Sequence, residues 1–339
     1  MPLPRVTLGV DGIQTTPLGF GCASLFRISD SVERSAVLRT AYEYGLRHFD
    51  VAPMYGLGRA EHELGVFARS RRDELTIATK FGIRLTLAAR GLSHAQGPLR
   101  RLLAARPALR DQARTHAAAP SGRLYEHGGF DATSARRSLE RSLRALRTDY
   151  IDVFLLHDPL PGTVRSDEVL ACLEHARAAG LIRSWGLAGD LEPTNEVARS
   201  FPGDVPVRQF RDDVFLRALQ GRCRPVDGAF VTFGVLDQAL PCIVRHCSEN
   251  ESRRLRWKRT VGSDCGDPDI VASFLLRAAL RDNSPGVVLF GSTKPSRVRS
   301  AANLVSQAPE GPDLDAFLRM LDAELGQLPD PQSAERERS

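Results

Sequence analysis

Ionisable side chains stand at the ends of several apolar segments of the sequence. Asp50 closes "LRHFD", Lys80 closes "ELTIATK" and His157 closes "YIDVFLLH". Tyr55 follows five residues after Asp50. A phenol is a weak acid at neutral pH, but a nearby ammonium lowers its pKa, and a carboxylate keeps that ammonium charged. We therefore expect Tyr55 to be a general acid tuned by Lys80 and Asp50, with His157 orienting a carbonyl oxygen as hydride or another nucleophile reaches carbon.

Each of these residues alone has a simpler explanation. An aspartate at a strand end commonly caps a helix or forms a turn, and a lone lysine is usually solvated. The chain, however, has only three lysines among its 339 residues, namely Lys80, Lys258 and Lys294. One of them stands at the end of an apolar segment, as do the acid and the imidazole. The combination indicates one shared site.

The elements that must position these residues alternate along the chain. Segments with strand character are 18–22, 46–50, 74–80, 150–157, 182–189, 205–210, 228–234 and 286–291. Segments with helical spacing are 31–45, 59–70, 134–147, 166–180, 193–200, 213–220, 267–282 and 295–305. Eight β-α repeats predict an α/β fold, a (β/α)8 TIM barrel, in which the strand ends share one face. An open, doubly wound sheet is the rival, but no G-x-G-x-x-G follows the first strand.

The ends of the chain add to this barrel. A turn at Asp11-Gly12 predicts an N-terminal β-hairpin, and 314–325 predicts an extra C-terminal helix before a polar tail at about 329–339. No boundary is visible, so we expect one domain over 1–339.

Two long interruptions follow strands of this barrel. Residues 81–133 and 234–266 are expected to be loops on the active-site face, and 98–112 could form a helix within the first.

The composition favours a soluble cytoplasmic protein that binds neither membranes nor nucleic acids. The net charge is +5, and the charges alternate in sign. "SRRLRWKRT", at 252–260, is interpreted as a basic surface stretch in the loop after the seventh strand. None of the six cysteines forms a C-x-x-C pair, and Cys242, His246 and Cys247 lack partners at metal spacing, so no metal site is predicted. No signal peptide or membrane-spanning segment is recognisable, and the sequence does not indicate an oligomeric state.

The motifs together resemble a known family. "DVAPMYG", "IATKFG", "YIDVFLLHDP" and "GSTKPSRV" are similar to segments of the aldo-keto reductases, and the resemblance runs from about Leu18 to Leu304. It implies an NAD(P)(H)-dependent oxidoreductase on a (β/α)8 barrel. "HDP" and the insertion after the third strand look most like the branch of sugar and pyridoxal dehydrogenases. The substrate would be a small carbonyl compound or a sugar: an aldehyde, a ketone or an aldose hemiacetal.

The resemblance also implies roles for individual residues. The family's catalytic tetrad falls on Asp50, Tyr55, Lys80 and His157. Gln209 matches the glutamine that contacts the nicotinamide amide. Phe233 matches the aromatic residue that stacks on the nicotinamide, although it could equally be a core phenylalanine. The segment after the last strand, which begins at Gly291, matches the part of the family that binds the adenosine phosphates, where a helix start favours anions. Within it, Ser292, Thr293 and Arg297 match positions that hold the 2′-phosphate of NADP.

The sequence departs from the family at five positions. Two of them, Ser300 and Ala301, stand where acidic or amide residues usually lie near the adenine. Ala188 and Gly189 stand where a serine and an asparagine often hold the carboxamide. Gly291 stands where a lysine often opens the last motif. Arg297 still favours NADP(H) over NAD(H).

Other functions remain open at this stage. The weakened carboxamide contacts would suit a non-catalytic NADP(H)-binding partner or sensor on the same barrel. A lysine at a strand end would also suit an aldolase or lyase that forms a Schiff base on Lys80.

Overall fold

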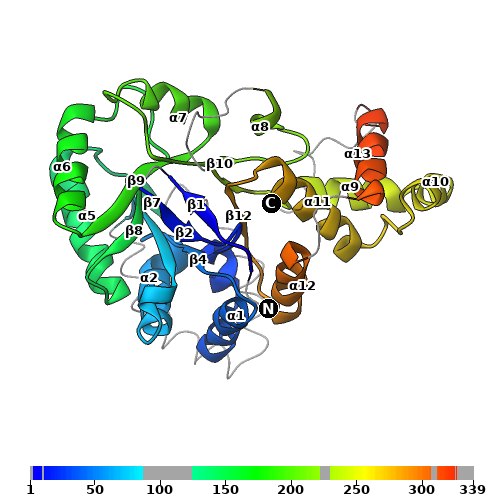
Figure 1. Ribbon diagram of the computed structural model, residues 1–339, viewed down its shortest axis with the longest axis horizontal. Coiled ribbons are helices and arrows are strands. Elements are labelled where there is room, and N and C mark those ends of the chain that lie inside the picture. Colours follow the sequence, from blue (N-terminus) through cyan, green and yellow to red (C-terminus); the bar gives the residue numbers. More distant parts are fainter. Residues whose placement is uncertain are drawn as a thin grey trace.

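A closed barrel of parallel strands forms the centre of the molecule (Figure 1). The computed structural model describes residues 3–9, 11–86, 124–221, 230–306, 311–324 and 326. The hydrogen-bonded order is β10-β11-β12-β3-β4-β5-β8-β9, and β9 closes on β10. The barrel strands are β3 Leu18–Gly21, β4 His48–Asp50, β5 Thr76–Phe81, β8 Ile151–His157, β9 Ile182–Gly189, β10 Val207–Arg211, β11 Phe230–Phe233 and β12 Val287–Phe290. The predicted (β/α)8 barrel is confirmed.

Helices surround the strands. Those between or after barrel strands are α1 Ser31–Glu43, α2 Ala60–Ala68, α5 Ala132–Leu146, α6 Ser166–Ala178, α7 Leu191–Ala198, α8 Ala218–Gly221, α11 Pro268–Asp282 and α12 Pro295–Ser306. Side-chain caps fix several of their starts. Asp30 accepts from the backbone amides of Val32 and Glu33 at α1, and Asp267 caps α11.

The N-terminal hairpin closes one end of the barrel. Its strands, β1 Val6–Leu8 and β2 Ile13–Thr15, pair antiparallel as predicted. Leu8 and Ile13 are fully buried and join the apolar cluster inside the barrel. Thr76, the first residue of β5, donates to the carbonyl of Gln14 in the hairpin. The hairpin thus lies at the amino ends of the strands, which leaves the carboxyl ends for a site.

The first long interruption contains a second hairpin. Strands β6 Ile83–Leu85 and β7 Tyr125–His127 pair antiparallel directly after β5. The possible helix at 98–112 and the polar tail at about 329–339 lie outside the described residues.

The second long interruption is helical, and its prediction as a loop was wrong. It contains α9 Ala239–Ser248 and α10 Glu251–Val261, and α10 packs on the predicted C-terminal helix, α13 Pro312–Glu324. Trp257 of α10 is fully buried, with its ring centroid 5.8 Å from that of Phe317. Apolar packing of one face therefore stabilises α10 despite its many arginines.

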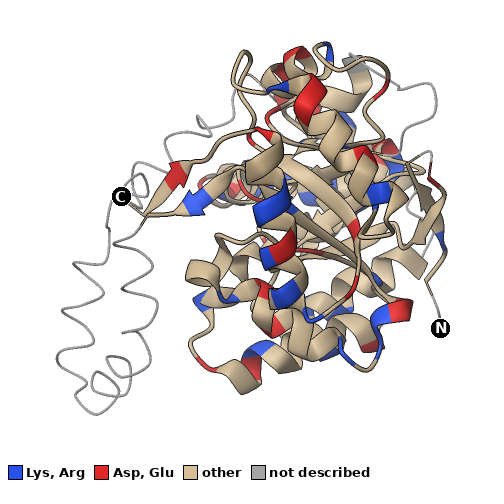
Figure 2. Ribbon diagram, turned by 90° about the vertical axis from the view of Figure 1, so that its left-hand side faces the viewer, with Lys and Arg blue, Asp and Glu red and all other residues tan. Residues whose placement is uncertain are grey.

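The basic stretch 252–260 is accordingly a helix rather than a loop. Arg254 pairs with Asp264 at 2.6 Å, and Arg256 pairs with Glu324 of α13. These contacts give its arginines structural partners. Figure 2 shows basic and acidic positions interspersed over the described elements.

The helix predicted at 213–220 forms only at its end, in α8. The carboxylate of Asp213 accepts from the amides of Phe215 and Leu216, and Asp212 accepts from Ala218. Side-chain acceptors thus bind amides of this segment, and such bonds favour a turn over a helix. Within the described residues, no helix has the length and apolarity needed to cross a membrane, and no cluster of metal-ligating side chains occurs.

Candidate active site

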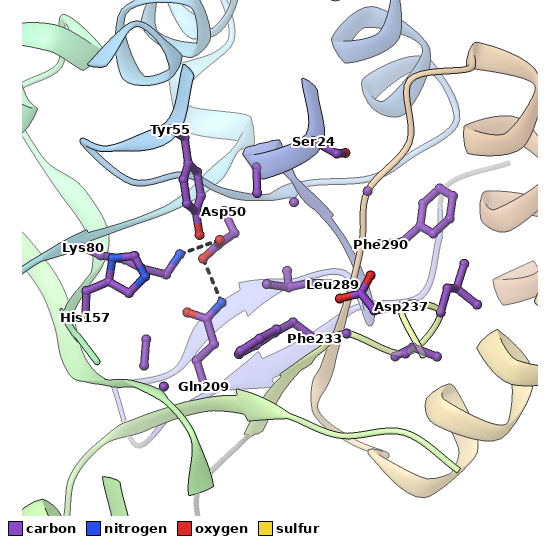
Figure 3. Close-up of a pocket in the computed structure, with 18 of the residues that line it drawn as sticks. Ser24, Asp50, Tyr55, Lys80, His157, Gln209, Phe233, Asp237, Leu289 and Phe290 are labelled. Atoms are coloured by element: carbon purple, nitrogen blue, oxygen red, sulfur yellow. Dashed lines mark hydrogen bonds and ion pairs between the residues drawn. The ribbon is translucent and has the colours of Figure 1, made fainter. Parts of the chain in front are cut away.

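The four ionisable residues meet at the carboxyl ends of the strands. Asp50 is the last residue of β4, Lys80 lies at the end of β5, and His157 ends β8. Tyr55 begins the short 3-10 helix η2 Tyr55–Gly58, just after β4. All four side chains line one cavity of about 360 Å³. Figure 3 shows the Tyr55 hydroxyl pointing toward Asp50 and Lys80.

An ion pair with a further polar contact lies at the base of this cavity. Lys80 Nζ donates to Asp50 Oδ1 at 2.5 Å, and both side chains are buried. Gln209, from β10, donates through Nε2 to Asp50 Oδ2 at 3.1 Å. Both carboxylate oxygens of Asp50 therefore have donors, which fixes the orientation of Lys80 and Gln209.

Burial and charge act in opposite directions on the two proton-bearing groups. Burial alone would lower the pKa of Lys80, but Asp50 and Tyr55 raise it above its usual value. Burial raises the pKa of Tyr55, whereas Lys80 lowers it, and burial prevails. The expected net lowering of the tyrosine pKa was therefore wrong in sign. Tyr55 stays protonated at neutral pH, as a proton donor must be.

His157 is a neutral imidazole in this setting. Burial, together with the charge of Lys80 and of His127, lowers the pKa of His157 to about 3. Its ring is perpendicular to that of Tyr55, with centroids 6.2 Å apart. A neutral imidazole can donate one hydrogen bond to a carbonyl oxygen without protonating it.

The residues expected around a nicotinamide line the same cavity. Gln209 Oε1 is buried and has no hydrogen-bond partner among the described residues, so an acceptor is open to an amide. Phe233 is half-buried, and its ring lines the cavity rather than lying wholly in the core (Figure 3). Gly291 lines this cavity too, and a Cβ there would lie only 3.0 Å from the Gly21 carbonyl oxygen and from Ser24 Oγ. These features fit a nicotinamide cofactor.

A second cavity of about 210 Å³ continues from the first and shares Phe290 and Gly291 with it. Ser292 and Arg297 line this second cavity, beside the start of α12. Thr293 lines neither of the two cavities. Arg297 pairs with Asp269 of α11 at 3.1 Å, so an acidic side chain stands where a phosphate was expected.

The departures from the family pattern also lie at the site. Ala188 pairs in register with both His157 and Gln209, and with Gly189 it lines the first cavity without a polar side chain. The sequence reading missed further polar residues of this cavity, which are Ser24, Arg27, Asp158 and Asp237. Asp158 directly follows His157 in "HDP", and that position was the available signal.

Comparisons with known proteins agree with this arrangement. The sequence model of the aldo/keto reductase family matches residues 17–192. D-threo-aldose 1-dehydrogenase from a Pseudomonas species is 32% identical over 197 residues, which cover 52% of this chain and 50% of that protein. Pyridoxal 4-dehydrogenase from Microbacterium luteolum is 42% identical over 82 residues, 23% of this chain and 24% of that protein. The chain thus spans half, or less, of the length of these relatives.

Solved structures share the fold over nearly the whole chain. An aldo-keto reductase from Klebsiella pneumoniae in complex with NADPH has a TM-score of 0.66 at 21% identity and covers 95% of each chain. A glycerol dehydrogenase from Gluconobacter oxydans has a TM-score of 0.68 at 16% identity, covering 94% of this chain and 95% of that one. At such identities the likeness concerns the fold.

Proposed function

Because the chain belongs to the aldo/keto reductase family, we propose that it is an NAD(P)(H)-dependent oxidoreductase that interconverts a carbonyl and an alcohol. The observation that carries the proposal is the convergence of Asp50, Tyr55, Lys80 and His157 in one cavity. Two of these residues also interact directly, because Lys80 Nζ lies 2.5 Å from Asp50 Oδ1.

Each residue has a distinct role in the proposal. Tyr55 donates the proton that the carbonyl oxygen takes up on reduction, and accepts it back on oxidation. Lys80 stabilises the tyrosinate that remains, and Asp50 holds Lys80 in place. His157, being neutral, donates a hydrogen bond to the same carbonyl oxygen and orients it.

The cofactor would be held by Gln209 and Phe233 at its nicotinamide end, and by Gly291, Ser292, Thr293 and Arg297 at its adenosine end. When bound, the nicotinamide supplies or accepts the hydride. We propose NADP(H) as the preferred form, because the Arg297 guanidinium suits a phosphate. Asp269 opposes that preference, because its carboxylate pairs with the Arg297 guanidinium.

The proposed substrates are small aldehydes, ketones or aldose hemiacetals. Polar side chains contribute to the lining of the cavity, and a relative that is 32% identical over 197 residues is named as an aldose dehydrogenase. We further propose that 1–339 is a single barrel domain and works in the cytoplasm. One cooperative unfolding transition and cell fractionation would test these two points.

A titration followed by turnover tests the function. The purified chain is titrated with NADPH and with NADH while protein fluorescence is recorded, and is then assayed with aldehydes and free sugars. Tight NADPH binding with turnover is the expected result. Binding without turnover of any substrate would instead favour the non-catalytic sensor.

A Schiff-base lyase is disfavoured by the site itself. Such chemistry needs an uncharged lysine. The raised pKa of Lys80, caused by Asp50 and Tyr55 against the effect of burial, keeps it protonated. Failure of borohydride to trap a carbonyl substrate on Lys80 is the corresponding expectation.

A further inference from the structure

Asp158 has an unusual backbone conformation beside the proposed catalytic histidine. Its φ is +49°, in the left-handed region that residues with a side chain rarely adopt. The next residue is Pro159, and a residue before proline normally prefers a negative φ. Strained residues of this kind cluster at functional sites, so the direction of the Asp158 side chain is a starting point for an inference.

Neighbouring residues hold this conformation in place. The backbone amide of Asp158 donates to the Ala188 carbonyl at 2.7 Å. A Cβ added to Gly189 would lie 2.7 Å from Asp158 Oδ1. The glycine that replaces the family's usual asparagine thus makes room for the Asp158 carboxylate. The departure at Gly189 and the conformation of Asp158 are parts of one local arrangement.

The carboxylate of Asp158 is partly exposed, and the residue lies at the cavity. Asp158 lines the same cavity as Tyr55, Lys80 and His157, and 48% of its side chain is exposed. No hydrogen bond joins its carboxylate to any residue that the structure describes. The Nε2 atom of His157 lies 3.9 Å from Oδ2 of Asp158. His157 is neutral because burial lowers its pKa to about 3, so this contact is not an ion pair at neutral pH.

The position of the carboxylate defines what it can bind. His157 is the proposed donor to the reacting oxygen, and Asp158 offers only an acceptor a short distance away. Two oxygens on adjacent carbons are spaced so that one can accept from His157 while the other, a hydroxyl, donates to Asp158. A substrate with an alkyl group in place of that hydroxyl would displace water from the carboxylate without replacing its hydrogen bond, which is unfavourable.

We propose that Asp158 is a specificity-determining residue that accepts a hydrogen bond from a hydroxyl on the carbon next to the reacting carbonyl. The substrates selected are α-hydroxy carbonyl compounds, including aldoses and their cyclic hemiacetals. The proposal rests on the function proposed above, because it takes the oxygen bound by His157 to be the reacting one.

A matched pair of substrates tests the proposal. Glycolaldehyde and propanal differ only by a hydroxyl in place of a methyl group next to the aldehyde. The kcat/KM of each, per free aldehyde, is measured with NADPH for the natural chain, Asp158→Asn and Asp158→Gly. Glycine tolerates the positive φ, so the second variant removes the carboxylate without new backbone strain. Asp167→Asn, on the exposed surface of α6, is the control for loss of a negative charge.

The readout is the ratio of the two kcat/KM values within each protein. We expect the natural chain and Asp167→Asn to prefer glycolaldehyde by about tenfold or more, since a hydrogen bond to a charged acceptor contributes more than one between neutral groups. In Asp158→Gly the ratio should approach one, with Asp158→Asn between. A ratio near one in the natural chain, or an unchanged ratio in Asp158→Gly, overturns the role of Asp158 alone. Absence of Tyr55-dependent turnover of both aldehydes overturns the proposed function and this proposal with it.

Discussion

Two buried carboxylates at opposite ends of the barrel are held differently. Asp152, near the start of β8, accepts from the Ile77 amide and from Arg183, each at 2.9 Å, and pairs with Arg72 at 2.7 Å. Asp50, at the end of β4, accepts from Lys80 and Gln209. The contacts of Asp152 end at one backbone amide and two arginine side chains. Those of Asp50 continue into a cavity, where Gln209 Oε1 is left open.

The difference separates a structural charge from a functional one. A buried carboxylate whose donors are complete, as at Asp152, contributes to the fold and offers nothing to a ligand. A buried pair beside a cavity, with an open acceptor and proton-bearing neighbours of shifted pKa, is arranged for chemistry. Breaking the first should cost stability, and breaking the second should cost activity.

Lys80→Met should have the largest effect, because it damages activity and fold together. It leaves Asp50 buried without its cation, which costs about 3–5 kcal/mol of unfolding free energy. It also removes the cation beside Tyr55, so turnover should fall below detection. Denaturant unfolding and kcat with an aldehyde measure the two losses.

The double variant Lys80→Met/Asp50→Leu sharpens this result. Removing both charges should restore most of the stability and none of the activity. Recovery of turnover in the double variant would contradict a functional role for the pair.

Asp152→Asn should affect the fold alone. It weakens the contacts to Arg72 and Arg183 and should lower the unfolding free energy by about 2–3 kcal/mol, as for hydrogen bonds to charged groups. The kcat of the folded variant should stay within about twofold, since no contact of Asp152 reaches the cavity. A large loss of kcat without loss of stability would contradict a purely structural role for Asp152.

Acid should destabilise the chain through two buried histidines. Burial, followed by the charge of Lys80, lowers the pKa of His48 to about 3, and burial, Lys80 and His127 do the same for His157. Each is neutral when folded and takes up a proton on unfolding below its unfolded pKa of about 6.5. Stability is therefore complete above pH ~6.5 and is lost as the pH falls toward 3, by about 2 kcal/mol per histidine at pH 5.

Unfolding midpoints between pH 7 and pH 4 measure this loss. His48→Leu should flatten the dependence, whereas His175→Gln, on the exposed surface of α6, should not. A pH profile that His48→Leu leaves unchanged would show that His48 does not titrate as described.

Asp269→Asn should have the smallest effect. Asp269 lines the second cavity, beside Arg297 and away from the four ionisable residues. The substitution removes the carboxylate that pairs with Arg297 and so frees the guanidinium for a 2′-phosphate. NADPH affinity should rise about two- to fivefold, the size expected of an exposed pair, and NADH affinity should change less. Fluorescence titration with both cofactors measures the ratio. An equal change for both would mean that Arg297 does not contact the 2′-phosphate.

The sequence predicted the barrel, and it predicted that four ionisable residues would meet at one face of it, for a physical reason. Strict β-α alternation leaves few topologies, and in a barrel the strand ends at Asp50, Lys80 and His157 must share one face. Helix α9 was missed because Cys242, His246 and Cys247 occupy its buried face and hide the apolar spacing. Asn250 and Gly262 at the two ends of α10 were usable caps.

Other features of the site could not be predicted from the residue types alone. The net pKa of Tyr55 required weighing burial against Lys80. The Arg297–Asp269 pair joins two helices, and the conformation of Asp158 depends on its approach to Gly189. Such contacts between distant segments follow from packing and not from local patterns.

Tyr55→Phe tests the central claim most directly, since it removes a single oxygen from the cavity. The kcat for an aldehyde should fall by about 10²–10⁴-fold, the usual contribution of a general acid. The dissociation constant for NADPH and the unfolding midpoint should remain close to those of the natural chain. A Tyr55→Phe protein that binds NADPH and reduces the aldehyde at the natural rate would contradict the proposed function.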